Sequence, residues 1–276
     1  MTAREFTLLL PVYAGNSVAQ LVEAFESSVD RQSLPPSAVV IVVDGPVPTE
    51  LDHALDRLAE ASPVPVSMIR LPRNAGLAMA LNEGLEASRT ELVARMDADD
   101  VSAPDRFERQ IPVIADRGLD ILGSGLAEFD GDVANVVATR VPPIGAEEIR
   151  RVATFRQPFH HPSVVYRRSA VLGVGGYPTD VGRFEDYVLF ARMLVAGASV
   201  DNLREPLLFY RLDGGAYARR GGWDQFKAEL RLQRELRRAG LTSRAQWFRN
   251  SLVRAAYRLV PTGIRMAAYR RVMTPS

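Results

Sequence analysis

Four times within the first 118 residues, an apolar run that suits a buried strand is followed by an amphipathic segment with helical spacing. The expected strands span residues 6–13, 38–45, 64–72 and 91–100, and the expected helices span 17–32, 48–61, 74–88 and 103–118. The second strand, AVVIVVDG, is almost wholly β-branched or apolar, which is typical of a strand buried on both faces. Short connections rich in Gly, Pro and Asp separate the elements. This alternation predicts an α/β fold with a mostly parallel, Rossmann-like central sheet flanked by helices.

Beyond residue 118 the pattern changes. Residues 120–130 and 136–143 are expected to form two strands around a Gly-Asp turn, which predicts a hairpin. Helices are expected over 146–154 and 183–197, and a last strand over 200–212. We therefore predict a main α/β domain over residues 1–222 and a helical C-terminal extension over residues 223–276.

Composition excludes several classes of protein. The chain has no Cys, so disulfides and thiolate metal sites are ruled out. The apolar run before Pro11 is too short for a signal peptide, and no apolar stretch approaches the ~18 residues that span a bilayer. We expect a cytoplasmic protein.

The net charge of +1 conceals an asymmetry along the chain. Residues 223–276 contain 12 Lys+Arg and 3 Asp+Glu, a net of +9, whereas the remaining residues contain 22 and 30, a net of −8. Segregated charge of this kind indicates an anionic partner for the C-terminal part, either a membrane surface or a nucleic acid.

Polar side chains follow three of the four expected parallel strands. Tyr13 ends the first, Asp44 the second, and the segment RMDADD, residues 95–100, the fourth. Ligands of open α/β sheets bind at the carboxyl ends of the strands, so these residues are expected to share one site.

The acidic segment predicts a divalent-metal site. Asp97 and Asp99 are two positions apart, so at a strand end both carboxylates point the same way and can reach one cation. Mg²⁺ and Mn²⁺ prefer hard oxygen ligands and commonly complete their shell with substrate phosphates. The alternative is a plain acidic turn, with Asp100 capping the turn or the helix expected to start near Pro104. Neither a G-x-G-x-x-G fingerprint nor a P-loop follows the first strand.

Several segments resemble the family 2 glycosyltransferases and occur in the order found there. They are PVYAGN (11–16), VVDG (42–45), RNAGLAMALNEGLEAS (73–88), MDADDVSAPDRFERQ (96–110), HPSVVYRRSAVLGVGGY (161–177) and FEDYVLFARML (184–194). The resemblance covers about residues 5 to 215 and implies the nucleotide-sugar-binding GT-A fold. Residues 219–240 further resemble bacterial members that build exopolysaccharides, the amylovoran type among them.

The resemblance implies roles for the residues at the strand ends. Pro11 and Tyr13 would line the nucleobase pocket, and Asp44 would hydrogen-bond the base or ribose. Asp97 would meet the ribose or the metal, and Asp99 would be the metal ligand proper.

Three further donor contacts and the catalytic pair are also implied. Arg73 and Asn74 would lie beside the base and the diphosphate, with Gly76 letting the backbone approach closely. Asp186, within the pair Glu185-Asp186, would be the catalytic base.

Two departures from the family pattern are visible. Asp44-Gly45-Pro46 stands where an Asp-Asp-Gly-Ser sequence is usual, and Asp213 stands where many relatives have a His near the end of the last strand. The second departure leaves the third metal ligand open.

Glycosyl transfer suits this combination of residues. Negative charge grows on the departing diphosphate, and a cation held by carboxylates stabilises it. On the opposite face a carboxylate can accept the proton of an attacking hydroxyl, and one in-line displacement inverts the anomeric carbon. Asp186 lies near the start of an expected helix, whose N-terminus keeps a carboxylate ionised.

Structural interpretations compete with the functional ones. Glu185-Asp186 can simply complement the helix dipole, and His160-His161 is better explained as structural than as a metal or phosphate contact. Arg167-Arg168 suits a diphosphate contact or a solvated strand edge equally well. Gly175-Gly176 needs no more than a turn.

The basic extension favours an interfacial membrane helix within residues 241–276. Apolar residues recur there at helical spacing, namely Phe248, Leu252, Ala256 and Leu259. Arg-rich flanks beside such a stripe are typical of helices that lie in an anionic membrane surface. The alternative is a helical hairpin packed against the main domain or a second subunit.

The sequence as a whole predicts an inverting glycosyltransferase that depends on Mn²⁺ or Mg²⁺. It would move a sugar from a nucleoside diphosphate donor, with UDP as the expected nucleotide, to a hydroxyl of a glycan or lipid-linked glycan. Peripheral contact with the inner face of the membrane is also expected. The nearest enzyme alternative is a nucleotidyltransferase acting on sugar phosphates. A non-catalytic protein that binds nucleotides or nucleic acids is the alternative from another class.

Overall fold

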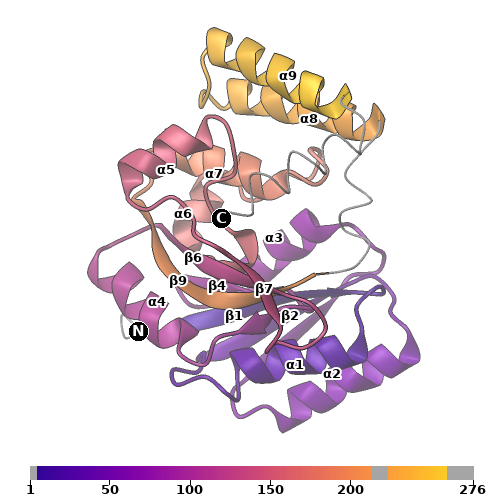
Figure 1. Ribbon diagram of the computed structural model, residues 1–276. Coiled ribbons are helices and arrows are strands. Elements are labelled where there is room, and N and C mark those ends of the chain that lie inside the picture. Colours follow the sequence, from indigo (N-terminus) through magenta and orange to yellow (C-terminus); the bar gives the residue numbers. More distant parts are fainter. Residues whose placement is uncertain (1–4, 213–222, 260–276) are drawn as a thin grey trace.

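A computed structural model describes residues 5–212 and 223–259, and its centre is a nine-stranded sheet (Figure 1). The strands are β1 (Phe6–Tyr13), β2 (Ala38–Asp44), β3 (Val66–Arg70), β4 (Leu92–Arg95), β5 (Val101–Ser102), β6 (Ile121–Phe129), β7 (Val136–Arg140), β8 (Val165–Arg167) and β9 (Val200–Arg211). The helices are α1 (Val18–Ser28), α2 (Thr49–Ala61), α3 (Leu77–Ala87), α4 (Arg106–Asp116), α5 (Ala146–Ala153), α6 (Arg168–Gly173), α7 (Glu185–Val195), α8 (Trp223–Arg238) and α9 (Arg244–Leu259), with a 3-10 turn, η1 (His161–Ser163).

The first half of the sheet confirms the parallel arrangement expected from the sequence. The order β3-β2-β1-β4 is linked by parallel pairs throughout. Tyr13 pairs with Asp44 at the ends of β1 and β2, and Leu9 pairs with Arg95 at the end of β4. This register brings three carboxyl ends of strands to one edge of the sheet.

The second half is mixed. β8 lies between β4 and β6 and is antiparallel to both, whereas β6 and β9 are parallel. The predicted hairpin is confirmed as the antiparallel pair β6–β7, which has an irregularity at Glu128 and Phe129. The short strands β5 and β8 and the short helix α6 were not predicted, because two to six residues are too few to show a period.

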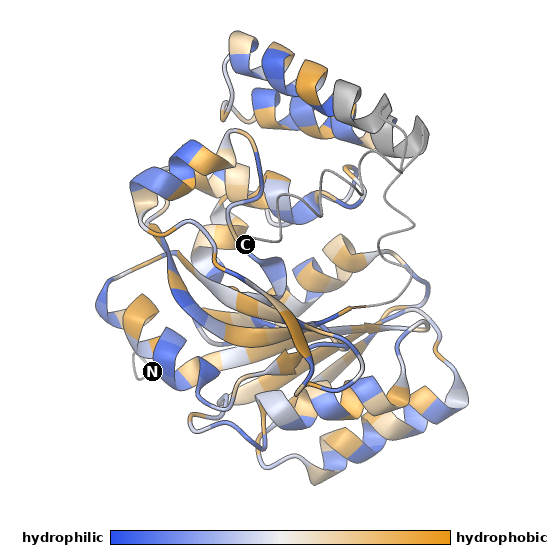
Figure 2. Ribbon diagram, in the orientation of Figure 1, coloured by the Kyte–Doolittle hydropathy of each residue, from blue (hydrophilic) through white to orange (hydrophobic). Residues whose placement is uncertain are grey.

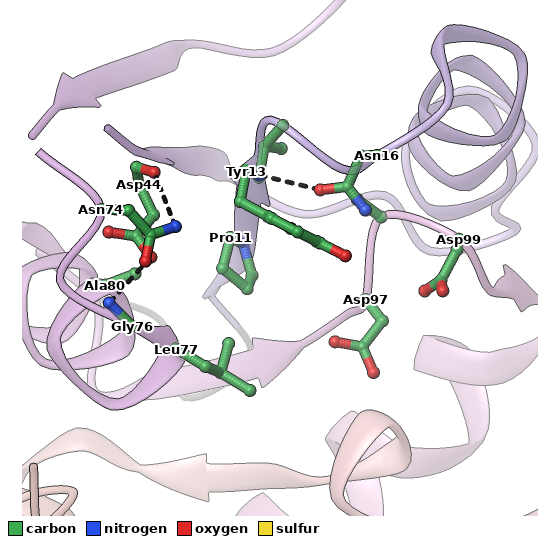
Figure 3. A pocket seen from close by; sticks show the side chains of 12 residues that line it. Pro11, Tyr13, Asn16, Asp44, Asn74, Gly76, Leu77, Ala80, Asp97 and Asp99 are labelled. Carbon is green, nitrogen blue, oxygen red and sulfur yellow. Dashed lines mark hydrogen bonds between the residues drawn. The ribbon is translucent and has the colours of Figure 1, made fainter. Parts of the chain in front are cut away.

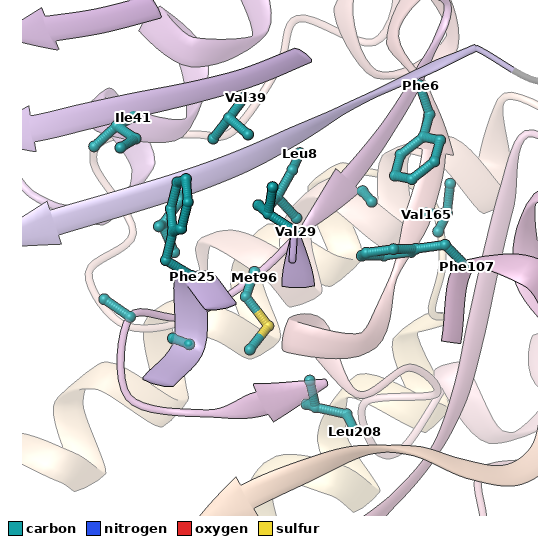
Figure 4. Close-up of a cluster of buried hydrophobic side chains, with 14 of the residues drawn as sticks. Phe6, Leu8, Phe25, Val29, Val39, Ile41, Met96, Phe107, Val165 and Leu208 are labelled. Carbon is teal, nitrogen blue, oxygen red and sulfur yellow. The ribbon is translucent and has the colours of Figure 1, made fainter. Parts of the chain in front are cut away.

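Helices cover both faces, as expected. Apolar residues of α1, α2 and α4 form one buried cluster with the sheet, and those of α3, α5, α6 and α7 form another on the opposite face (Figures 1 and 2). In the first cluster the rings of Phe6 and Phe107 lie 4.8 Å apart between centroids, and Phe25 packs over β1 and β2 (Figure 4). Because both faces of the sheet are covered, its strand ends are the part of the sheet left open to ligands.

Two helix starts differ from the prediction. α3 begins at Leu77 with Gly76 at its N-cap, and Asn74 lies outside it. α4 begins at Arg106 with Asp105 at its N-cap, so Asp100 is not the cap of this helix. In both cases the residues before the helix form the loop at the strand ends, and their polar groups bond to neighbouring segments.

The C-terminal helices form an antiparallel pair above α7 (Figure 1). Leu232 and Leu236 of α8 are buried against Tyr187 and Val188 of α7 and against Val181. No helix among residues 5–212 and 223–259 combines the length and the apolar composition needed to cross a bilayer. The domain boundary at residue 222, Asp213 and the tail from residue 260 lie outside the described residues.

Candidate functional site

A pocket of about 410 Å³ opens at the carboxyl ends of β1, β2 and β4 (Figure 3). It is lined by Pro11, Val12, Tyr13, Asn16, Asp44, Asn74, Gly76, Leu77, Ala80, Asp97, Ala98 and Asp99. The pocket thus brings together seven of the eight donor-binding residues predicted from the sequence. Arg73, the eighth, is exposed and is not part of this lining.

The Asp44 carboxylate holds the loop before α3 in place. One oxygen accepts the backbone N–H of Ala75 at 2.6 Å. The other accepts the backbone N–H of Gly76 at 2.9 Å (Figure 3). The Asn74 amide donates to the Asp44 backbone carbonyl at 3.3 Å. Asp44 is therefore a buried brace for this wall of the pocket, with a lone pair left on each oxygen for a ligand.

Two glycines allow this loop to pass close to β2. At Gly45, with φ of +85°, an added Cβ would lie 2.4 Å from the backbone nitrogen of Asn74. At Gly76, φ is +90°, yet no protein atom lies within 4 Å of where a Cβ would stand. The tight backbone approach within the protein is thus at Gly45, whereas Gly76 is required for its conformation and leaves space on the pocket side.

Tyr13 and Asn16 form the outer rim. Asn16 accepts the backbone N–H of Tyr13 through Oδ1 at 2.8 Å, and the Tyr13 ring is half exposed (Figure 3). The exposed ring is available to a flat ligand, and its role in a nucleobase pocket stays a prediction. Asn16 was not predicted, because a single polar residue in a turn carries no pattern.

Asp97 is held by a buried arginine. Arg95, only 2% exposed, donates from Nη1 to Oδ2 of Asp97 at 2.6 Å and from Nη2 to Oδ1. This bidentate pair fixes the orientation of the carboxylate and neutralises its charge. Arg106, also fully buried, supports the pair by donating to the Arg95 carbonyl at 2.8 Å.

Asp99 and Asp100 are held from the far end of the sheet. Arg211, the last residue of β9, donates its Nε–H to the Asp99 carbonyl at 2.9 Å and its backbone N–H to Oδ1 of Asp100 at 3.0 Å. Asp100 is buried, so its carboxyl braces the turn. Burial, with repulsion from Asp97, raises the pKa of Asp99 to about 6. Burial, with the charges of Asp97 and Asp99, raises the pKa of Asp100 well above its ordinary value.

The acidic turn has the donor set of a hard divalent cation. Oxygen atoms of Asp97, Asp99 and Asp100 all lie within 4.8 Å of one another. Crowded carboxylates with raised pKa values are stabilised when a cation is added. Arg95 already occupies both oxygens of Asp97, so the Asp99 side chain, which points into the pocket, is the most available ligand (Figure 3).

Asp186 and Glu185 lie at the N-terminus of α7, outside the lining of this pocket. Oδ1 of Asp186 accepts the backbone N–H of Tyr187 at 2.6 Å. Burial raises the pKa of Asp186 to about 6, opposed by that bond and by the charge of Arg95. Burial raises the pKa of Glu185 to about 7, and Oε2 of Glu185 has no hydrogen-bond partner in the described parts of the chain.

A chain of neutral polar groups backs Asp186. Nε2 of His161 and the Tyr177 hydroxyl are 2.9 Å apart, and the Tyr177 hydroxyl donates to that of Tyr166 at 3.4 Å. Nδ1 of His161 lies 3.9 Å from Oδ2 of Asp186. Burial lowers the pKa of His161 well below its ordinary value, so this contact is not an ion pair at neutral pH. The structural interpretation of His161 is confirmed.

Arg167, Arg168 and Gly176 have structural roles. The side chains of Arg167 and Arg168 donate to the carbonyls of Leu119 and Leu85 and so tie β8 and α6 to neighbouring segments. Gly176 has φ of +68° in a turn, beside the side chain of Asn82. None of these three residues lines the pocket.

Arg95, Arg106, Arg211 and Asn16 are the residues that sequence reasoning missed. Arg95 and Arg106 are charged residues inside the core, where a binary apolar pattern expects none, and Arg211 is a partly buried residue at the end of β9. For Arg95 one signal was available, because an arginine in an otherwise apolar strand stands directly before an acidic turn.

The comparisons with known proteins agree with the fold. The sequence model of the family described as Glycosyl transferase family 2 matches residues 7–173. An uncharacterised glycosyltransferase of Haemophilus influenzae is 35% identical over 96% of this chain and 98% of its own. The amylovoran biosynthesis glycosyltransferase AmsE of Erwinia amylovora is 31% identical, also over 96% and 98%.

A third relative carries a fuller name. The UDP-Gal:alpha-D-GlcNAc-diphosphoundecaprenol beta-1,3-galactosyltransferase of Escherichia coli is 31% identical over 98% of this chain and 96% of its own.

Solved structures share the fold at low sequence identity. TarS 1–349 of S. aureus in complex with UDP superposes with a TM-score of 0.63 at 17% identity, over 84% of this chain and 65% of the TarS chain. The mannosyltransferase PcManGT of Pyrobaculum calidifontis, in complex with GDP-Man and Mn²⁺, gives a TM-score of 0.66 at 21% identity, over 92% and 69%. These neighbours confirm the GT-A fold expected from the sequence.

Proposed function

Because this chain belongs to glycosyltransferase family 2, we propose that it transfers a sugar from a UDP-sugar to a hydroxyl of a lipid-linked glycan, with inversion and with a divalent cation. The donor assignment draws on the Escherichia coli relative named for UDP-Gal and on the TarS structures with UDP and UDP-GlcNAc. The acceptor assignment draws on the diphosphoundecaprenol in the name of the same relative. Family membership decides against the nucleotidyltransferase and nucleic-acid-binding alternatives.

The observation that carries the donor proposal is that the two ends of the pocket are lined by different kinds of polar group. At one end the Asp44-braced loop presents Gly76 and an open lone pair on each carboxylate oxygen of Asp44. At the other end lie the carboxylates of Asp97 and Asp99. A nucleoside fits the first end and a cation-bound diphosphate the second, because hard carboxylate oxygens share a cation with phosphates.

The chain's own residues supply positioning and proton transfer. The Tyr13 ring would cover the base and the Asp44 loop would hold the nucleoside. Asp99 would hold the cation, which would neutralise charge on the departing diphosphate. Arg95 keeps Asp97 in one orientation. Asp186 accepts the proton of the acceptor hydroxyl, and its raised pKa brings it closer to the pKa range that suits a base at neutral pH.

The donor proposal is tested by thermal unfolding with UDP, GDP, dTDP and CDP, each with and without Mn²⁺ or Mg²⁺. Ligand at about 100 times its dissociation constant adds about 2.7 kcal/mol, which is visible as several degrees. We expect a metal-dependent shift that is largest with UDP. Asp99→Asn should remove the metal dependence.

The matched control is Asp116→Asn, an exposed acidic residue on α4 with no role in the pocket. It should leave the shift unchanged. A UDP shift that is equal with and without metal would contradict the role of Asp99. A larger shift with GDP than with UDP would indicate a GDP-sugar donor instead of a UDP-sugar.

The stereochemical proposal needs a separate measurement. The anomeric configuration of the product, read by proton NMR after transfer from an α-linked UDP-sugar, should be β. An α-linked product would remove the single-displacement mechanism and the role of Asp186 as its base.

A further inference from the structure

The α8–α9 pair has an inner side that packs on the rest of the molecule and an outer side that is exposed. On the inner side, the Asn250 amide donates to the Thr154 carbonyl at 2.7 Å, and Arg254 pairs with the buried Glu229 of α8 at 2.9 Å. Four residues apart on α9, Asn250 and Arg254 lie on one side of the helix. This side fixes α9 on the body of the protein.

The other side of α9 carries an exposed apolar stripe. Phe248 is 65% exposed, Leu252 60% and Val253 48%, and these are the large apolar side chains exposed on the described part of the helix pair. Phe248 and Leu252 are each two positions from the inner residues, which is about 200° around a helix. They therefore face away from the catalytic domain, at the outer edge of the molecule where α9 lies in Figure 1.

Basic side chains surround one end of this stripe. A hollow of about 580 Å³ between α8 and α9 is lined by Arg234, Arg237, Arg238, Arg244, Trp247 and Phe248. Residues 223–254 contain eight Lys+Arg and three Asp+Glu, a net of +5. Two of the acidic residues, Glu229 and Glu235, already pair with arginines inside the helix pair.

Two of the four arginines that line the hollow are available to a ligand. Arg237 donates to the Thr242 carbonyl, and Arg238 pairs with Glu235. Arg234 and Arg244 are exposed and form no ion pair or hydrogen bond with the described residues. Guanidinium groups that are free of protein partners can bind phosphate in a bidentate manner.

We propose that the outer face of the α8–α9 pair is a membrane-docking surface that binds the phosphate headgroups of anionic lipids in the arginine-lined hollow and inserts Phe248 and Leu252 into the bilayer surface. Charge complementarity selects the partner, since a net positive helix pair meets a negative leaflet. The apolar stripe beside the hollow suits the boundary between headgroups and acyl chains. A nucleic acid would satisfy the arginines and leave the stripe exposed.

This surface extends the membrane helix expected within residues 241–276. Half of the residues that line the hollow come from α8, before residue 241. The docking proposal rests on the proposed function in one respect: docking would bring the enzyme to a lipid-linked acceptor. The binding it predicts needs neither donor nor acceptor, so it is measured independently.

The test is co-sedimentation of the full-length protein with vesicles of phosphatidylglycerol and phosphatidylcholine, compared with phosphatidylcholine alone. We expect binding that requires phosphatidylglycerol and weakens as salt is raised. Arg234→Gln with Arg244→Gln should weaken binding about twenty-five-fold, since each basic residue at an anionic surface contributes about fivefold. Phe248→Ser with Leu252→Ser should weaken it at least about tenfold, with little dependence on salt.

The matched control is Arg57→Gln with Arg89→Gln, which removes two exposed arginines from other parts of the surface. This variant should bind like the unchanged protein. Unaltered unfolding temperature and UDP response in all variants show that the fold and the donor pocket are intact, so a loss of vesicle binding belongs to the α8–α9 pair.

Three outcomes would overturn the docking surface. One is equal binding to neutral vesicles or none to anionic ones while UDP still stabilises the protein, which leaves the proposed function standing. Another is tight binding to duplex DNA in the absence of vesicle binding. The third is a change from dimer to monomer in the Phe248→Ser with Leu252→Ser variant without any loss of vesicle binding, which would assign the stripe to a second copy.

Discussion

The pocket at the strand ends and the buried groups around Asp186 are built on different physical principles. In the pocket, an exposed ring, backbone amides and carboxylates surround a space of about 410 Å³. Around Asp186, the groups are buried, and His161 and Tyr177 are held neutral by burial. The first arrangement suits a charged ligand that arrives with its own cation, and the second suits a proton acceptor.

Arg95 connects the two regions. It binds Asp97 directly, and its charge opposes the rise in the pKa values of both Asp99 and Asp186. One buried cation thus keeps carboxylates on both sides closer to the ionised state. The comparison between the regions can be tested by removing residues from each and from the link between them.

Asp186→Asn is expected to have the largest effect. Loss of a general base lowers kcat by about 10²–10⁴, while stabilisation by UDP and metal stays unchanged because Asp186 is outside the pocket lining. Steady-state kinetics together with thermal shifts separate the two readouts. Loss of UDP stabilisation in this variant would show that Asp186 contributes to donor binding, and the two regions would then not have separate roles.

The same residue is expected to set the acid limb of the pH profile. Because burial raises the pKa of Asp186 to about 6, the residue is ionised above that pH and protonated below it. The rate should therefore rise with pH to a plateau, with a midpoint at about 6, in saturating donor and metal. A flat profile across the range from one unit below that midpoint to one unit above it would rule out a base with this pKa.

Arg95→Gln is the next largest change. Breaking a mostly buried bidentate pair is expected to cost about 3 kcal/mol in the free energy of unfolding, measured by urea denaturation. The pH midpoint of activity should also move up, since the pKa of Asp186 loses a positive neighbour. Arg95→Lys keeps the charge, so it should retain the midpoint while losing part of the stability. Equal midpoints in both variants would remove Arg95 as the link.

Asp44→Ala should act on the donor side alone. The variant loses both bonds to the backbone of the loop before α3, so the KM for the UDP-sugar should rise about tenfold with a smaller change in kcat. Asp120→Ala is the matched control, because Asp120 accepts the Ser199 N–H at 2.8 Å and does not line the pocket. If both variants changed KM alike, the effect would be general loosening of the protein.

Substitution of the two tyrosines behind Asp186 should have the smallest effects, with Tyr177→Phe the larger of the two. It leaves the buried Nε2 of His161 without its partner, at a cost of about 1 kcal/mol in unfolding free energy. Tyr166→Phe removes only the longer bond of 3.4 Å and should cost less. The difference is measured by thermal unfolding of the two variants side by side. A larger loss in Tyr166→Phe would reverse the order of these two bonds.

Much of the pocket could be predicted from the sequence because its residues follow directly after regular strands. The alternation of apolar runs with amphipathic segments indicated the parallel order, and parallel order places Tyr13, Asp44 and the acidic turn at one edge. Seven of the eight residues predicted to bind the donor line the pocket for that reason, and Arg73 does not. The third helix was expected to begin at Asn74, but the Asn74 amide instead donates to the Asp44 carbonyl at the end of β2.

The sequence by itself determined the alternating elements, the parallel half of the sheet and the acidic turn, because local periodicity encodes them. Only the tertiary structure decided what holds that turn. Arg211 reaches the carbonyl of Asp99 from 112 residues away, and β8 is inserted between β4 and β6. Contacts of this kind depend on which strand ends meet after folding. The partly buried side chain of Arg211 is satisfied there by groups of Asp99, Gly131 and Glu23, all from distant segments.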